Sequence, residues 1–280
     1  SKLLLSYDKT VNNASEKMAK IGQIAATALS RPDKGYYWPV IDLNFNINQN
    51  SGSYFIYEVH YDKPKVRHFN IRGENRPAFQ LGFPQVTRGV DWKKVKLPAV
   101  NRFSWKNKIA LYIQSHALLR FTQRLDILAE EYLFINFYFT IFTQQPFYDN
   151  NEWFFPVKLG DVVVGYFTGQ MIDGVILLKT FLFLTNEGTP EAKRLEEIAS
   201  LAKEDIKYWK IDTLHSFFKS DIINDKHIRS IFEEAGCGGL FRIEVDDPGK
   251  AYSGEKKMAT ALRSYLGLME ESTVEVEAEP

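Results

Sequence analysis

The sequence predicts an α+β fold: an antiparallel sheet with a packed helix, an additional N-terminal hairpin and C-terminal helices. Three observations support this class. Two runs of alternating apolar and polar residues lie between Tyr36 and Arg72, which is typical of half-buried strands. Short apolar runs separated by turn residues follow between Leu133 and Leu184. Segments with helix-start signals and helical periodicity come after Pro190.

The N-terminal third begins with a helix, predicted over residues 14–30 from its composition and apolar stripe. The sequences V-I-D-L-N-F-N-I-N and Y-F-I-Y-E-V-H-Y then predict a hairpin, with its turn at Gln49–Gly52. Residues Lys65–Ile71 are interpreted as an extension of this hairpin. Residues 73–105 contain several glycines and prolines without periodicity, and we expect a long surface connection there.

The middle of the chain predicts a strand, a helix and a meander. Lys108–Gln114 is a short strand, and residues 115–132 form a helix with Ser115 as its N-cap. The apolar face of this helix carries Leu118, Phe121, Leu125, Leu128 and Tyr132. Four antiparallel strands are predicted next: Leu133–Thr143, Trp153–Lys158, Asp161–Thr168 and Gly174–Leu184.

The C-terminal third predicts helices and an acidic tail. Thr189 caps a helix that begins at Pro190 and runs to about Lys203. Two further helices cover Asp212–Ser220 and Asn224–Ala235, the second closed by Gly236. Residues 270–280 contain five glutamates and no basic residue, so we expect a disordered tail that shields basic surface in cis. The predicted regions are therefore 1–107, 108–188, 189–268 and 269–280.

Composition excludes several classes of protein. The 280 residues carry no net charge and one cysteine, Cys237, so an internal disulfide framework is excluded and this thiol is expected to pack. Histidine and cysteine pairs at ligand spacing are missing from the sequence, and we expect no metal and no cofactor. Because no apolar stretch approaches about 20 residues, we expect no membrane partner and a cytoplasmic location.

The zero net charge conceals a basic segment. Residues 63–108 hold twelve lysines and arginines against two acids, Glu74 and Asp91, together with six phenylalanines and tryptophans. Basic residues interleaved with aromatic ones are typical of nucleic-acid-binding surfaces. The predicted nucleic-acid-binding residues are Lys93, Lys94, Lys96, Arg102 and Lys106. The alternative interpretation is an ordinary basic surface with the aromatic residues in the core.

One histidine and two arginines share a face of the predicted helix 115–132. In S-H-A-L-L-R-F-T-Q-R, His116, Arg120 and Arg124 are spaced i, i+4, i+8. Histidine titrates near neutral pH, and guanidinium groups bind phosphate oxygens with paired donors. The row therefore indicates a phosphodiester site, and the alternative is a solvated helix face.

The same residues carry a resemblance to a known group of proteins. The segment 108–184 resembles the barnase–EndoU–colicin–RelE superfamily of ribonucleases, and within it toxin-like families with a His-Ala-x-x-Arg-x-x-x-Arg helix. The matching residues are His116, Ala117, Arg120 and Arg124, and the candidate last-strand residues are Lys179 and Thr180 in V-I-L-L-K-T-F-L. In a regular strand, Lys179 and Thr180 point to opposite faces of the sheet.

The resemblance implies a metal-independent endoribonuclease. His116 acts as general base or acid, Arg120 and Arg124 bind the phosphate, and Lys179 or Thr180 supplies a further donor. No second histidine lies in the segment, so Tyr166, Lys179 or water is the candidate for the other proton-transfer role. The alternative is a non-catalytic protein of the same fold that binds nucleic acid or an acidic protein. The expected partners are RNA, with DNA as the alternative, and an inhibitory protein.

Overall fold

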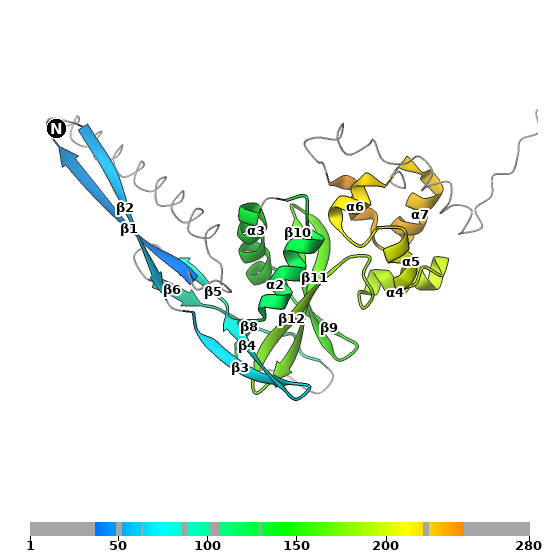
Figure 1. Cartoon of the computed structure of the whole chain (residues 1–280), viewed down its shortest axis with the longest axis horizontal. Coiled ribbons are helices and arrows are strands. Elements are labelled where there is room, and N and C mark those ends of the chain that lie inside the picture. The colour runs from blue at the N-terminus through cyan, green and yellow to red at the C-terminus, as the bar shows by residue number, and fades with distance from the viewer. Residues whose placement is uncertain are drawn as a thin grey trace, which may run out of the picture. The chain divides into compact units, whose positions relative to one another are not determined.

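The computed structural model describes residues 37–48, 52–62, 64–85, 89–100, 107–128, 130–220 and 224–243. The chain divides into two compact units, Ser1–Leu182 and Phe183–Pro280 (Figure 1). The predicted helix over residues 14–30 and the acidic tail lie outside the described residues. None of the helices that the structure describes is long and apolar enough to cross a membrane.

The first unit is built on an eight-stranded, mostly antiparallel sheet, which confirms the predicted α+β class. In spatial order its strands are β3 (Val66–Ile71), β4 (Glu74–Gln80), β8 (Ile109–Ile113), β12 (Val175–Phe183), β11 (Val162–Ile172), β10 (Glu152–Leu159) and β9 (Phe147–Asp149). A short strand, β7 (Lys94–Val95), also pairs with β8. The pairing of β8 with β12 is parallel. The helix α2 (Ser115–Arg124) follows β8 directly.

Two-residue turns connect several neighbouring strands. Arg72 and Gly73 join β3 to β4, and Asp173 and Gly174 join β11 to β12, with φ of +52°, +82°, +48° and +76° respectively. Positive φ at both central residues matches the right-handed twist of a hairpin, and glycine adopts it without strain. The sequence Met171-Ile172-Asp173-Gly174 predicts a turn here, and the structure confines it to Asp173 and Gly174.

The N-terminal hairpin is confirmed, but its predicted extension is wrong. Strands β1 (Tyr37–Asn48) and β2 (Gly52–Asp62) pair antiparallel as a separate two-stranded sheet. The segment predicted as a third strand of this hairpin, Lys65–Ile71, instead contains β3, which pairs with β4 in the main sheet. Phe69 of this segment is buried against Ala78 and Leu177. This burial favours pairing in the main sheet over pairing with the N-terminal hairpin.

The prediction of a long connection over residues 73–105 is also wrong. This stretch forms β4, β5 (Gly82–Gln85), β6 (Gly89–Trp92) and β7. Each strand is short, and prolines at positions 77 and 84 interrupt the alternation that would reveal them. Strands β4 and β7 pair with β8, for example with Ile113 opposite Phe79, whereas β5 and β6 pair with each other. Tertiary pairing therefore overrides a weak local signal.

The helical region of this unit differs from the prediction in two ways. The helix begins after Gln114, whose side chain makes no capping bond, so Ser115 is its first residue rather than its N-cap. It ends at Arg124, and α3 (Glu130–Thr143) follows. The predicted strand Leu133–Thr143 is thus a helix, and β9 takes its place in the meander. A helix that is apolar on most sides shows no helical stripe, which explains the error.

Aromatic side chains join α2 and α3 to one face of the sheet. Phe121 contacts Phe137 of α3, Phe167 of β11 and Phe181 of β12, with ring centroids 5.1 to 5.9 Å apart. Leu118 and Leu125 are also buried, which confirms the predicted inner face of α2. The side chain of Tyr132 is not among those that the structure describes, so its predicted place on this face stays a prediction. This packing leaves the opposite face of α2 toward solvent.

The second unit contains the three predicted helices with adjusted ends, namely α4 (Pro190–Ala199), α6 (Leu214–Lys219) and α7 (Lys226–Glu234). The sequence did not predict α5 (Lys203–Tyr208), which follows α4 as a separate helix, or the 3-10 helix η2 (Gly238–Arg242) after α7. Thr189 caps α4 as predicted, because its hydroxyl accepts a 3.0 Å hydrogen bond from the Ala192 amide. Cys237 is fully buried, and burial raises its pKa. This thiol stays protonated near neutral pH and is not an activated nucleophile.

Candidate functional site

The helix α2 holds three cationic or titratable residues on one side, which we call the α2 polar face (His116, Arg120 and Arg124). His116 and Arg120 are exposed, whereas Arg124 is half-buried. The spacing of four residues brings each side chain above the next, about 6 Å along the helix axis. Phe121 and Leu118 anchor the opposite side of the helix in the core. The packing therefore fixes which way the α2 polar face points.

The three residues of the face have different partners. The guanidinium group of Arg120 donates a 3.0 Å hydrogen bond to the Gln123 side chain on the same helix. Among the described residues, Arg120 forms no ion pair with a carboxylate. Arg124 instead donates to the main-chain carbonyl of Phe181 in β12. Arg120 is thus the guanidinium group of this face most available to an anionic ligand.

A fourth cation lies near the N-terminal end of the face. Phe79 of β4 lies opposite Ile113 of β8, three residues before His116, and the positive charge of Arg76 on β4 acts on His116. Arg76 also binds Glu74 through two hydrogen bonds of 2.9 and 2.6 Å. The sequence indicates Arg76 only as one cation of the basic segment. Its position near His116 depends on the pairing of β4 with β8, which neighbouring residues in the sequence do not reveal.

This environment lowers the pKa of His116 below its usual value of 6.5. The largest cause is partial burial, which disfavours the charged imidazolium. Positive charge on Arg120, Arg124 and Arg76 acts in the same direction. His116 is therefore neutral at pH 7, which is the protonation state that a general base requires.

The two candidate residues of β12 occupy different surroundings. Thr180 is half-buried, and its hydroxyl lies 3.5 Å from the Phe181 carbonyl that also accepts from Arg124. It therefore belongs to the Arg124 end of α2, about 12 Å along the helix from His116. Lys179 forms an ion pair with Glu152 of β10. The structure does not bring Lys179 to the α2 polar face.

A break in strand alternation explains why the sequence could not separate these two residues. A side chain at Gly169 would contact Ile176 and Leu178, and one at Gly165 would contact Phe181. Gly165 and Gly169 flank Phe167, which contacts Phe121 of α2, so all these side chains share the helix-covered face. A regular strand would place Leu178 and Phe181 on opposite faces, so β12 is irregular at Lys179 and Thr180.

Tyr166 lies away from the α2 polar face. It is buried against Phe147 and Phe154, with ring centroids 5.5 and 5.7 Å away. Its neighbour Phe167 points toward α2, so Tyr166 points to the other side of the sheet. Neither Tyr166 nor Lys179 is therefore placed to exchange a proton with a group held at His116.

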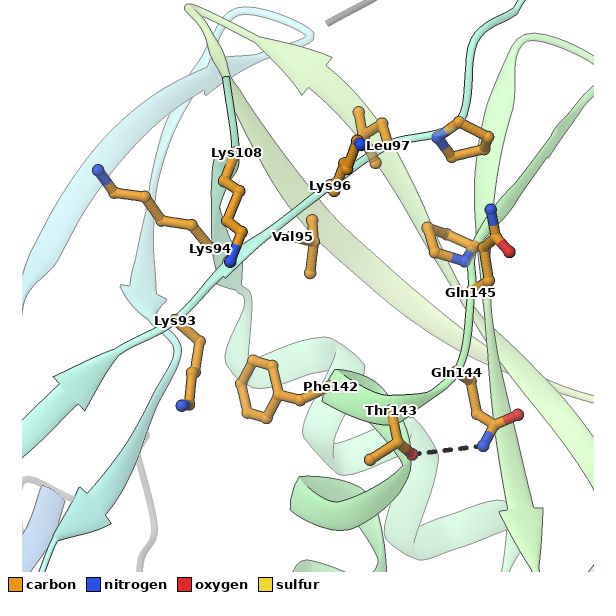
Figure 2. A pocket seen from close by; sticks show the side chains of 12 residues that line it. Lys93, Lys94, Val95, Lys96, Leu97, Lys108, Phe142, Thr143, Gln144 and Gln145 are labelled. Atoms are coloured by element: carbon orange, nitrogen blue, oxygen red, sulfur yellow. Dashed lines mark hydrogen bonds between the residues drawn. The ribbon is translucent and has the colours of Figure 1, made fainter. Parts of the chain in front are cut away.

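The predicted nucleic-acid-binding lysines gather elsewhere. A cavity of about 580 Å³, which we call the lysine cleft, is lined by Lys93, Lys94, Lys96, Lys108, Phe142 and Gln144, among others (Figure 2). It lies where β7 meets the start of β8, beside the end of α3. His116 follows the far end of β8, about 16 Å away along the strand. Arg102 and Lys106 lie outside the described residues.

Comparison of the chain with protein-family models, with curated proteins and with solved structures gave no match.

Proposed function

We propose that this chain acts on nucleic acid and, most concretely, that it is a toxin-like, metal-independent endoribonuclease with its reaction centre at His116. The observation that carries this proposal is a neutral histidine set among arginines on a fixed helix face. A neutral imidazole can accept a proton, while guanidinium groups attract a phosphodiester and stabilise charge that builds up on it. The resemblance of segment 108–184 to toxin-like ribonucleases supports the same reaction.

The proposed reaction needs only the RNA and water. His116 takes the proton of a ribose 2′-hydroxyl, and the 2′-oxygen forms a bond to phosphorus. The bond from phosphorus to the 5′-oxygen breaks, and that oxygen receives a proton from a water molecule because Tyr166 and Lys179 lie elsewhere. The hydroxide that remains then takes the proton from His116, which restores the neutral imidazole and the water. The products are a 2′,3′-cyclic phosphate and a 5′-hydroxyl. Arg120 binds the phosphate oxygens, and Arg124 positions α2 against Phe181.

A second function, non-catalytic nucleic-acid binding, is favoured by a different observation. Positive side chains lie near both ends of β8 and can bind phosphates. The α2 polar face is an exposed helix surface with a single histidine, so it has no second histidine for the other proton transfer. Phosphate contacts of this kind give affinity without chemistry, and they make binding strongly dependent on salt. In this case RNA or DNA is held and released intact.

Cleavage of a labelled RNA in the presence of a chelator separates the two functions. We expect His116→Ala to abolish cleavage, and Arg120→Ala to lower kcat by roughly 10²-fold with a smaller change in KM, because its charge matters most in the transition state. As a matched control, Lys158→Gln removes a positive charge from β10 and should leave the rate unchanged. If the wild-type protein binds RNA but leaves it uncut, the non-catalytic function replaces the ribonuclease.

A further inference from the structure

We infer that the lysine cleft is a binding subsite for one or two nucleotides of a single-stranded nucleic acid, with the phosphates on Lys96 and Lys108 and a base against Phe142. This inference rests on the proposed nucleic-acid function but not on cleavage. It adds Lys108, Phe142 and Gln144, which the sequence did not single out, and it assigns the chemical form of the ligand.

Charge is the first argument. Four lysines line the cleft, and its lining includes no carboxylate side chain. Lys93 forms an ion pair with Asp91. Lys94, Lys96 and Lys108 are exposed and form no ion pair with any carboxylate that the structure describes. The last turn of α3 carries about half a negative charge, which offsets only a fraction of these three cations.

The register of β7 and β8 gives the second argument. Lys94 pairs with Ala110 and Val95 with Ile109, and Lys96 and Lys108 are the residues next to the end of this two-pair ladder in the two segments. Two cations beside one ladder end repel each other. Figure 2 shows Lys108 extending toward the α3 side of the cleft, whereas Lys94 extends away from it. A phosphate between Lys96 and Lys108 would relieve their repulsion.

The side of the cleft opposite the lysines offers groups that can bind a base. Phe142, Thr143 and Gln144 from the end of α3 form the side that faces these lysines, and Gln144 donates a 3.3 Å hydrogen bond to the Thr143 hydroxyl (Figure 2). The Phe142 ring is partly exposed. Aromatic rings bind bases by stacking, and amide groups can bond to base edges.

The volume of the cleft favours a single-stranded nucleic acid over a duplex as its ligand. Its volume of about 580 Å³ lies within the range of roughly 300–1,000 Å³ of small-ligand sites. A flipped-out nucleotide can enter such a hollow. A duplex is a convex rod with its bases stacked inside, and it can touch only the rim.

The test is fluorescence anisotropy with a labelled single-stranded DNA octamer. This probe lacks the 2′-hydroxyl and cannot be cut by the proposed reaction, so the result is independent of cleavage. We expect the double variant Lys96→Gln, Lys108→Gln to lose at least about tenfold in affinity at 0.05 M salt and to reduce the salt slope by about 1.4. Its melting temperature should stay equal or rise, because a repulsion is removed.

Matched variants separate charge from structure. The double variant Lys96→Arg, Lys108→Arg should keep the wild-type salt slope. Phe142→Leu should lower affinity with an unchanged slope, because stacking releases no counterions. Lys158→Gln, outside the cleft, should bind like the wild type, and His116→Ala should still bind the octamer. Wild-type affinity in the double glutamine variant, or equal affinity for a blunt eight-base-pair duplex, would overturn the inference.

Discussion

At the scale of single residues, His116 and Arg124 show how one helix face can hold both a reactive group and a structural one. Arg124 is half-buried and donates to the Phe181 carbonyl, so it helps to hold α2 against β12. His116 lies two turns earlier, is exposed, and feels the charge of Arg124 across that distance. The sequence predicts the spacing of these residues but not the division of roles, which depends on contacts with β12.

The pKa of His116 can be measured directly by following its imidazole carbon and proton signals with pH. We expect a value below 6.5, and we expect Arg120→Gln to move it upward, because a neighbouring positive charge is removed. Lys158→Gln should leave it unchanged. Because the folded state holds this proton less tightly than the unfolded state, His116 should favour folding above pH 6.5 and lose that contribution as pH falls below it. An elevated value in the wild type would contradict this account.

At the scale of elements, the first unit depends on the packing of α2 against the sheet and against α3. Phe121 sits at the centre, in contact with Phe137, Phe167 and Phe181. It is fully buried, whereas Leu119 on the same helix is 52% exposed. Because this anchor helps to fix the direction of the α2 polar face, its loss should misplace His116 as well as destabilise the unit.

Urea unfolding of two alanine variants tests the anchor. Phe121→Ala should lower the free energy of unfolding by about 3–5 kcal/mol, through lost burial and the cavity left behind. Leu119→Ala is the matched control on the same helix, and a surface position should change stability by only about 0.5 kcal/mol or less. Similar losses in both variants would show that Phe121 is not on the core-facing side of α2.

At the scale of the whole molecule, the sequence predicts those parts whose signals are local. The cap at Thr189, the turn at Asp173–Gly174 and the β1–β2 hairpin follow from residues adjacent in the chain. The helix α3 and the strands β4 and β7 do not, because α3 is buried against distant strands and β4 and β7 both pair with β8. The candidate sites divide in the same way: the row on α2 is a local pattern, whereas the approach of Arg76 to His116 requires the pairing of β4 with β8.

Charge is also distributed at this scale, since the basic segment is balanced to a net charge of zero by acids elsewhere. The tail over residues 270–280 supplies five of these acids: Glu270, Glu271, Glu275, Glu277 and Glu279. A flexible acidic segment competes with nucleic acid for basic side chains at high local concentration. The hypothesis that the tail shields basic surface in cis therefore predicts a change in binding when its charge is removed.

Replacing those five glutamates with glutamine should raise affinity for the single-stranded octamer several-fold at low salt. The gain should vanish at about 1 M salt, where the screening length falls to about 3 Å. A control variant changes net charge equally with Asp149→Asn, Asp161→Asn, Glu196→Gln, Glu204→Gln and Glu234→Gln, all exposed positions outside the tail. If the tail acts by occupying the basic surface, its variant gains more affinity than the control. Equal gains would show that net charge alone is responsible and that the tail does not shield the cleft.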